Sequence, residues 1–219
     1  MSFSTAHHPR RGVKDWVELM LKDHGFLRLG WHNLHEIRPG VWRANQPAPK
    51  DVRQVAKLGI KTIVNLRGPR SDGGWRLEKE ACDKAGITLV DFTVRSRAVP
   101  DYEVLRGAKE MFQAIEYPMM MHCKSGADRA GIMSALYLLL MENATVDEAL
   151  EMLSLKYLHV KQAKTGLLDA FIEAYRPAQD AGKSMLDWAK HDLNPQQLHD
   201  EFMAQGWAVR LVDDILKRE

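Results

Sequence analysis

The stretch MMMHCKSGADRAG, residues 119–131, places an apolar run directly before a short loop of small and charged residues. The apolar run is typical of a short buried strand, and the residues after the loop begin a helical pattern. Cys123, one of only two cysteines in the chain, stands where this strand ends. Because functional sites in open parallel sheets lie at the carboxyl ends of strands, this position predicts a site rather than a packing role.

The segments before this loop alternate between strand and helix patterns. We expect strands within residues 35–47, 60–66, 87–94 and 118–122, and helices over 15–27, 48–58, 75–84 and 100–115. This alternation predicts an α/β fold, with a central, mostly parallel sheet flanked by helices. After Gly131 the pattern is helical: we expect helices over 132–141, 145–155 and 166–175, a linker over 177–183, and two or three helices within 184–219.

Composition limits the possible functions. The formal net charge of +2 is too small to indicate nucleic acid as a partner. The longest apolar run, residues 132–141, is about half as long as a membrane span requires. Two cysteines cannot form a disulfide framework, so we expect a reducing, cytoplasmic location. Cys82 falls on the apolar side of a predicted helix and is expected to pack in the core.

The loop after the strand has the composition of an anion site. Backbone N–H groups of a tight loop and of a helix N-terminus can surround an anion, and Arg129 can contact two of its oxygens at once. The same dipole and positive charge favour a thiolate at Cys123. Gly126 permits the turn that aims the amides. The expected phosphate-binding residues are Lys124, Ser125, Gly126, Ala127, Asp128 and Arg129.

This loop resembles the signature of the cysteine-dependent protein tyrosine phosphatase superfamily, in which His-Cys is followed by five residues and Arg. His122, Cys123, Gly126 and Arg129 match it position by position. The segments WRANQP (residues 42–47) and GIKTIVNLRG (59–68) resemble the atypical dual-specificity branch of bacteria, plants and fungi. The resemblance covers roughly residues 35–176. It implies a phosphatase domain there, an N-terminal arm and helix over 1–34, and a helical extension over 177–219 that packs on or beside the domain.

The resemblance also implies a mechanism. Cys123 would attack phosphorus and form a phosphocysteine intermediate, while Arg129 and the loop amides stabilise the transition state. His122 would hold the loop and support the thiolate. Neither a metal nor a cofactor is needed for this chemistry. The substrate would be a phosphorylated protein, or a phosphorylated lipid or inositol.

The general acid is harder to place. The family takes an aspartate from the loop that follows the strand before the signature, but residues 93–100 contain no carboxylate. Asp101 comes just after this loop, where it could serve as the acid or cap the next helix. Asp128 directly precedes Arg129, as in myotubularin-like phosphatases, where an acid role has been assigned to it. It could equally oppose the positive charge of the loop.

Two further features bear on rate and substrate. Ala130 stands where the family has Ser or Thr, so the hydroxyl that helps the thiolate leave is missing, and we expect slow breakdown of the intermediate. Arg67, Arg95 and Arg97 follow predicted strands on the expected side of the site. With Lys124 they could hold a second phosphate, or they could form a solvated rim.

Two other functions compete with a phosphatase. A phosphate-binding module without activity would explain the displaced acid and Ala130, but it would not need the thiol of Cys123. A rhodanese-type sulfurtransferase also uses a loop cysteine, but the His122-Cys123 start and the long helical region after the loop fit a phosphatase better.

Overall fold

The computed structural model describes residues 12–22 and 32–216. They fall into two compact units: Met1–Thr93 with Ile115–Gly126, and Val94–Ala114 with Ala127–Glu219. The chain therefore passes from the first unit to the second within the signature loop. The arm over residues 1–11 and the predicted helical residues 23–27 lie outside the described ranges. The predicted domain boundaries at residues 34 and 176 stay predictions.

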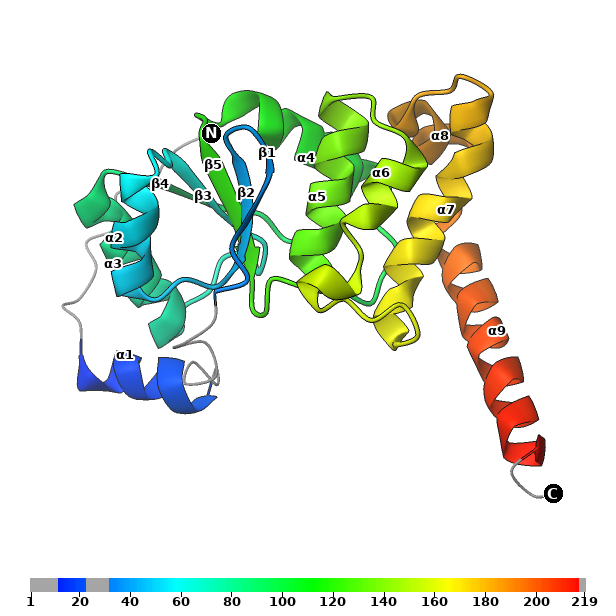
Figure 1. The fold of residues 1–219 in the computed structure, drawn as a ribbon, viewed down its shortest axis with the longest axis horizontal. Coiled ribbons are helices and arrows are strands. Elements are labelled where there is room, and N and C mark those ends of the chain that lie inside the picture. Colours follow the sequence, from blue (N-terminus) through cyan, green and yellow to red (C-terminus); the bar gives the residue numbers. More distant parts are fainter. Residues whose placement is uncertain (1–11, 23–31, 217–219) are drawn as a thin grey trace. The chain divides into compact units, whose positions relative to one another are not determined.

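The first unit contains a five-stranded sheet (Figure 1). Its strands are β1 (His35–Arg38), β2 (Val41–Asn45), β3 (Thr62–Asn65), β4 (Thr88–Asp91) and β5 (Met119–Cys123), in the spatial order β1-β2-β5-β3-β4. Only β1 pairs antiparallel with its neighbour; the other pairings are parallel. The predicted mostly parallel sheet is confirmed. β5 lies between β2 and β3 and is buried along its whole length, which explains its apolar sequence.

Two helices of the first unit, α2 (Pro49–Lys57) and α3 (Gly73–Ala85), cover one face of this sheet. α1 (Val13–Val17) and the π-helical turn η1 (Glu18–Lys22) pack on α3. α2 and α3 pack on the sheet through a core that includes Val52, Ile63, Met120 and Cys82. The predicted core position of Cys82 is confirmed, and burial raises the pKa of its thiol. This helical layer fixes the strands whose carboxyl ends carry the signature loop.

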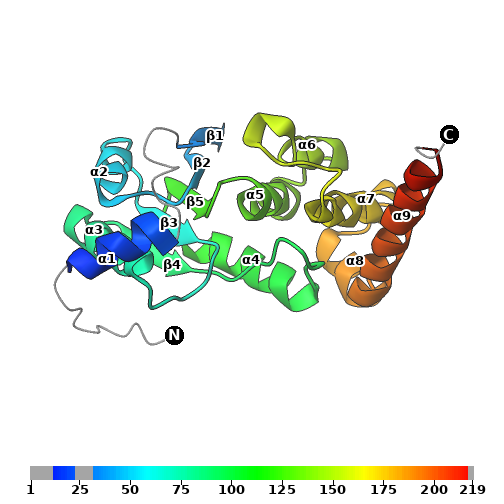
Figure 2. The same cartoon turned by 90° about the horizontal axis from the view of Figure 1, so that it is seen from below.

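The second unit is helical. It contains α4 (Tyr102–Ala114), α5 (Asp128–Met141), α6 (Val146–Glu151), α7 (Leu167–Asp180), α8 (Met185–His191) and α9 (Pro195–Leu216), with two short 3₁₀ turns, η3 (Leu155–Tyr157) and η4 (Lys164–Gly166). α5 is the central helix and contacts α4, α6, α7 and α8; Figure 2 shows it nearly end-on. Its burial explains why residues 132–141 are apolar except for Ser134. A capping box of Thr145 and Glu148 begins α6.

The predicted linker over residues 177–183 is wrong for its first part, because α7 continues through Pro177 to Asp180. Proline removes one helical hydrogen bond, but neighbouring contacts hold this turn in place. The side chain of Gln179 donates to the carbonyl of Ala144 and accepts from the amide of Val146. Beyond the turn, the ring of Trp188 packs on the rings of Phe171 and Tyr175, so α8 is part of the packed unit.

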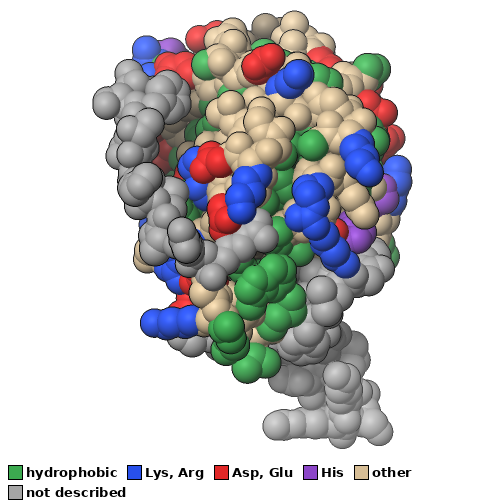
Figure 3. Space-filling view, turned by 90° about the vertical axis from the view of Figure 1, so that its left-hand side faces the viewer, with side chains coloured by type: hydrophobic (Ala, Val, Ile, Leu, Met, Phe, Trp, Pro, Cys, Tyr) green, Lys and Arg blue, Asp and Glu red, His purple; other side chains and the backbone are tan. Residues whose placement is uncertain are grey.

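The surface of the first unit includes exposed aliphatic side chains on α1 and η1, among them Val13, Val17 and Leu21. Figure 3 shows hydrophobic side chains gathered in the lower part of its view. Within residues 12–22 and 32–216, none of the helices combines the length and the apolar character needed to cross a bilayer.

Candidate active site

The candidate nucleophile, Cys123, is the last residue of β5 and is only 2% exposed. Parallel pairing places it opposite Asn45, the last residue of β2. Its Sγ atom accepts a hydrogen bond from the backbone amide of Gly126, at 3.3 Å. The sulfur therefore lies at the base of a loop whose amide already points toward it, as a thiolate requires.

Three successive carbonyls of the signature loop accept hydrogen bonds from residues outside the loop. The carbonyl of Lys124 accepts from the amide of Gln46 at 3.4 Å, and that of Ser125 accepts from Asn33 Nδ2 at 3.1 Å. The carbonyl of Gly126 accepts from Nη2 of Arg43 at 2.8 Å, and the Arg43 side chain is fully buried. Since a peptide's N–H points opposite to its C=O, three outward carbonyls leave the amides between them to face the interior of the loop.

Gly126 is required by its backbone. Its φ angle is +78°, a region that residues with a Cβ rarely adopt. A Cβ atom here would also lie 2.8 Å from the carbonyl carbon of Ala44 and from the amide nitrogen of Asn45. Both the conformation and the close approach of β2 therefore exclude a side chain at this position of the signature.

His122 is held by a buried polar network. Its Nε2 atom lies 2.6 Å from Oε1 of Glu78 on α3, and both side chains are fully buried. The other carboxylate oxygen of Glu78 accepts from Gln46 Nε2 at 3.0 Å, and Gln46 accepts in turn from Arg67. His122 Nδ1 lies 3.3 Å from the carbonyl oxygen of Cys123. The network connects α3 and the end of β2 to the residue that precedes the nucleophile.

In the second unit, a histidine lies between two carboxylates at the start of α5. His159 Nδ1 is 2.8 Å from Oδ1 of Asp128, and its Nε2 is 2.7 Å from Oδ2 of Asp169 on α7. Burial disfavours the charged ring, but the hydrogen bonds to Asp128 and Asp169 outweigh it and raise the pKa of His159 from 6.5 to about 9. His159 is therefore an imidazolium at neutral pH, and the carboxylate of Asp128 is paired with it.

The residues around Arg129 begin the central helix of the second unit. The amide of Gly131 donates to the carbonyl of Ala127, which closes the first turn of α5. Ala130 is fully buried, and its carbonyl accepts from the hydroxyl of Ser134 at 2.7 Å. That hydroxyl serves the helix backbone, so it does not stand in for the Ser or Thr that the family has at position 130.

Other sequence-predicted residues have structural partners. Asp101 is exposed and accepts from the amide of Val104 at 2.9 Å, which confirms its interpretation as a cap of α4. Asp91, the last residue of β4, accepts from Asn65 Nδ2 and from the indole of Trp75. Arg67 belongs to the network behind His122.

The remaining cations of the predicted rim are exposed or partly exposed. Arg95 and Arg97 are exposed in the stretch before α4, and Lys124 is partly exposed. Their proposed contact with a second phosphate stays a prediction. Within the described part of the chain, no group of three or more His, Cys, Asp and Glu side chains is arranged to hold a metal ion.

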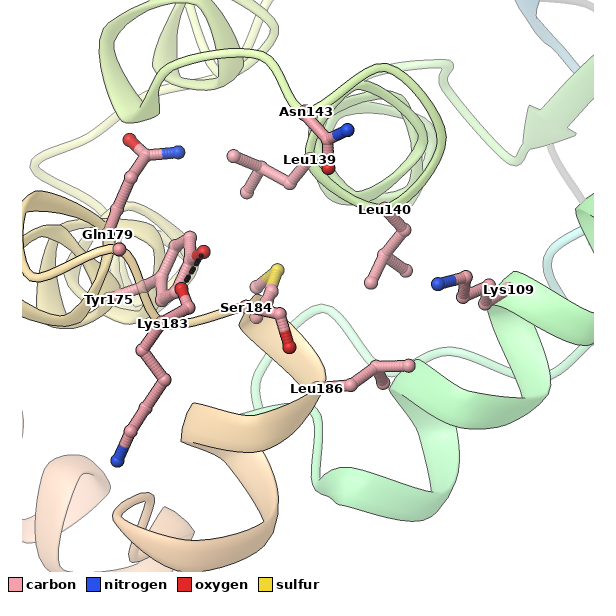
Figure 4. Close-up of a pocket in the computed structure, with 11 residues that line it drawn as sticks. Lys109, Leu139, Leu140, Asn143, Tyr175, Gln179, Lys183, Ser184 and Leu186 are labelled. Carbon is pink, nitrogen blue, oxygen red and sulfur yellow. Dashed lines mark hydrogen bonds between the residues drawn. The ribbon is translucent and has the colours of Figure 1, made fainter.

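Each unit also has a cavity. In the first unit, a pocket of about 220 Å³ lies beside β2 and α2 and is mostly apolar; its lining includes Leu34, Val55 and Met120. In the second unit, a pocket of about 310 Å³ lies between α4, α5, α7 and α8 (Figure 4). Polar groups around the second pocket serve the fold: the Tyr175 hydroxyl donates to the Lys183 carbonyl, and Gln179 ties α7 to the start of α6.

Sequence reasoning missed the residues that support the loop. Arg43 had one signal, a lone arginine in an apolar strand inside the WRANQP segment, although a strand arginine can also be solvated. Asn33, Glu78, His159 and Asp169 had none, because they are far from the loop in sequence and lack a characteristic spacing.

A strand-end thiol, a glycine-dependent loop of inward amides and an arginine at the start of the next helix define the class of cysteine-dependent phosphatases of the dual-specificity type. The family model described as "DSP-PTPase phosphatase fused to NAD+ Kinase" matches residues 31–167, more than half of the chain. The chain belongs to this family.

Similar proteins agree with this assignment. The dual specificity protein phosphatase TpbA of Pseudomonas aeruginosa is 28% identical over 120 residues, which cover 54% of this chain and 52% of TpbA. The chain thus spans about half the length of this relative. Dual specificity protein phosphatase 26 of Rattus norvegicus is 24% identical over 152 residues, 67% of this chain and 68% of that protein.

Solved structures give the same fold. A crystal structure of P. aeruginosa TpbA has a TM-score of 0.53 and 22% identity, covering 68% of this chain and 91% of that one. Another structure of TpbA was solved in complex with pTyr. At this level of identity the likeness shows the fold alone.

Proposed function

We propose that this protein is a phosphatase that hydrolyses phosphomonoesters through a phosphocysteine intermediate on Cys123. The observation that carries the proposal is the arrangement of the loop carbonyls. Asn33, Arg43 and Gln46 bind three successive carbonyls from outside, while the Gly126 amide donates to the sulfur. These three tertiary hydrogen bonds hold the carbonyls outward. The amides of the loop therefore point inward as a ring of donors, which suits a tetrahedral dianion.

In the first chemical step, the thiolate of Cys123 attacks phosphorus, the S–P bond forms and the P–O ester bond breaks. The leaving oxygen takes a proton from a general acid and departs as an alcohol or phenol. In the second step, water attacks the phosphocysteine, the S–P bond breaks, and inorganic phosphate and the thiolate are released. Arg129 and the loop amides stabilise the charge on the equatorial oxygens in both steps.

For the general acid we propose Asp128, with the protonated ring of His159 behind it. The 2.8 Å hydrogen bond between them places a proton next to the carboxylate that precedes Arg129. The raised pKa of His159, to about 9, keeps the ring protonated at neutral pH, so Asp128 would act as the acid by taking this proton and passing it to the leaving oxygen. Asp101, which caps α4, is the alternative.

We propose a phosphotyrosine-containing or phosphoserine/threonine-containing protein, or a phosphorylated lipid or inositol, as the substrate. The pTyr complex of TpbA supports an aryl phosphate. The exposed cations Arg95 and Arg97 support a substrate with a second anionic group.

The central test is hydrolysis of p-nitrophenyl phosphate across about pH 5–8, with vanadate as inhibitor and thiosulfate as a control substrate for sulfurtransfer. Wild type is expected to be active, and Cys123→Ser to lose activity. Cys82→Ala is the matched control: it removes the other thiol, which is buried in the core, and should keep activity. Inactive wild type, or an active Cys123→Ser variant, would rule out the proposal.

The acid is assigned by replacing Asp101 and Asp128 with Asn, one at a time. Loss of the true acid should slow hydrolysis of alkyl phosphates far more than that of p-nitrophenyl phosphate, whose leaving group needs no proton. Equal losses on both substrates in Asp128→Asn would indicate a positioning role instead. If Asp128→Asn leaves the ratio of the rates on the two substrates unchanged and Asp101→Asn alters that ratio, the acid is Asp101.

A further inference from the structure

Among the side chains that the structure describes in the second unit, the exposed large hydrophobic ones gather in one short segment. Leu155, Leu158 and Val160 are 72%, 56% and 44% exposed. They lie in the connection between α6 and α7, which includes η3 and η4. Leu158 is even held at a positive φ of +63°, a conformation that costs a leucine free energy. Aliphatic side chains clustered in solvent on a connecting segment point to a binding role.

Lysines are interleaved with these aliphatic residues. Lys156, Lys161 and Lys164 are all exposed, and residues 152–168 contain no aspartate or glutamate. This stretch of the chain, residues 155–164, therefore exposes both aliphatic groups and positive charge. We call it the 155–164 segment.

The 155–164 segment is anchored rather than loose. Tyr157 and His159 alternate with the exposed residues and are buried, at 3% and 1% exposure. Through His159 the segment is hydrogen-bonded to Asp128, the residue that precedes Arg129 in the signature loop. Figure 1 shows the connection between α6 and α7 passing the end of α5 at which that loop enters the second unit. The exposed aliphatic groups are thus tied directly to the start of the catalytic helix.

We infer that the 155–164 segment docks on an anionic lipid surface, inserting Leu155, Leu158 and Val160 at the boundary between headgroups and acyl chains. Interfacial membrane binding needs apolar groups that can enter the bilayer and basic groups that contact anionic headgroups, and this segment has both without any acidic residue. An acidic protein partner would be served by the lysines but would leave three separate aliphatic side chains unexplained. Docking would place the Asp128 end of α5 close to the membrane surface, and that surface presents phosphorylated headgroups.

The test is co-sedimentation of the full chain with vesicles, which requires no turnover and is therefore independent of the proposed phosphatase chemistry. Vesicles of about one-third phosphatidylglycerol in phosphatidylcholine are compared with pure phosphatidylcholine. The wild-type chain should bind the anionic vesicles, lose binding at high salt, and bind the neutral vesicles weakly.

Two triple variants separate the two contributions. Leu155→Gln, Leu158→Asn and Val160→Thr together remove the aliphatic groups, with Asn chosen because it tolerates the positive φ of residue 158. This variant should lose about tenfold or more in the partition coefficient. Replacing the three lysines by Gln should lose about a hundredfold, since each exposed lysine contributes roughly fivefold near an anionic surface.

Matched controls are Leu58→Gln and the triple Lys50, Lys57, Lys61→Gln, which change exposed residues of the first unit in the same way. Both controls should keep vesicle binding, and all variants should keep hydrolysis of soluble p-nitrophenyl phosphate. Three results would overturn the inference: no binding to anionic vesicles, equal binding to neutral ones, or equal losses in the lysine variant and its control. Because every lysine replaced is exposed, the comparison of the triple lysine variant with its triple lysine control remains decisive even if the aliphatic variant does not fold.

Discussion

The histidine between Asp128 and Asp169 makes stability depend on pH in a defined direction. His159 has its pKa raised in the folded protein, from 6.5 to about 9. A group whose pKa is raised on folding stabilises the native state fully below its unfolded value, and this contribution is lost as the pH rises through the folded value. We therefore expect the free energy of unfolding to fall between about pH 6.5 and 9.

The size of the effect follows from the same values. Each tenfold difference in proton affinity corresponds to about 1.4 kcal/mol, so a pKa raised from 6.5 to about 9 corresponds to about 3 kcal/mol in total. Between pH 6 and 9 the loss should be about 2 to 3 kcal/mol, because half of the folded protein is still protonated at the upper limit. The side chain of His159 is fully buried, but that of Asp128 is 29% exposed, so solvent screening places the loss toward the lower end of this range.

The assay is urea unfolding at several pH values up to 9, in wild type and in a variant with His159→Gln and Asp169→Asn. The second change prevents Asp169, which is 4% exposed, from becoming an unpaired buried charge. The buried thiol of Cys82 is present in both proteins, so the loss of stability that its raised pKa causes at alkaline pH cancels in the comparison. If wild type and variant lose stability in parallel over this range, or if NMR places the His159 midpoint near 6.5, the reasoning is refuted.

Three further predictions concern the signature loop. Gly126→Ala should lower the free energy of unfolding by about 2 kcal/mol or more, because a Cβ would be 2.8 Å from Ala44 at a positive φ; a thermal shift within error of zero would contradict this. Arg43→Met should lower kcat/KM about ten- to a hundredfold with the fold retained, as the Gly126 carbonyl loses its buried donor; unchanged kcat/KM would show that the loop holds its shape without it. Ala130→Ser should raise the rate at which the phosphocysteine breaks down, seen as a smaller burst in rapid-quench experiments; an equal burst would show that a hydroxyl at position 130 does not speed this step.

The sequence predicted those parts of the fold that are governed by local patterns. The apolar run before Cys123 becomes the central strand, and the β-branched run in residues 60–66 becomes its neighbour β3. Both are buried on two faces, so continuous apolar runs were a reliable indication. The linker at Pro177 failed because contacts of Gln179 with residues beyond its own helix keep the turn helical, and such contacts leave no trace in a local pattern.

The same distinction between local patterns and contacts of distant residues applies to the candidate site. Cys123, Gly126 and Arg129 follow from one contiguous motif, whereas their supports come from other elements. Arg43 lies 83 residues from the carbonyl that it binds, and His159 lies 31 residues from Asp128. Nothing in a single sequence indicates which buried donor meets which carbonyl, because that pairing is decided by strand register and helix packing.

The ion pair of Asp128 with His159 also decides how Asp128 could act as an acid. A carboxylate at a helix N-terminus is stabilised in its charged form, and an imidazolium 2.8 Å away favours that form further. Asp128 can therefore donate a proton only after His159 has passed one to it, and Asp169 opposes this transfer because it stabilises the positive ring from the other side. Each turnover by this route would leave His159 neutral until the ring regains a proton. If Asp128 acts in this way, hydrolysis of alkyl phosphates by wild type should fall above about pH 9, where the ring is no longer protonated; equal losses on alkyl and aryl phosphates in Asp128→Asn would instead indicate that the ion pair only positions the loop.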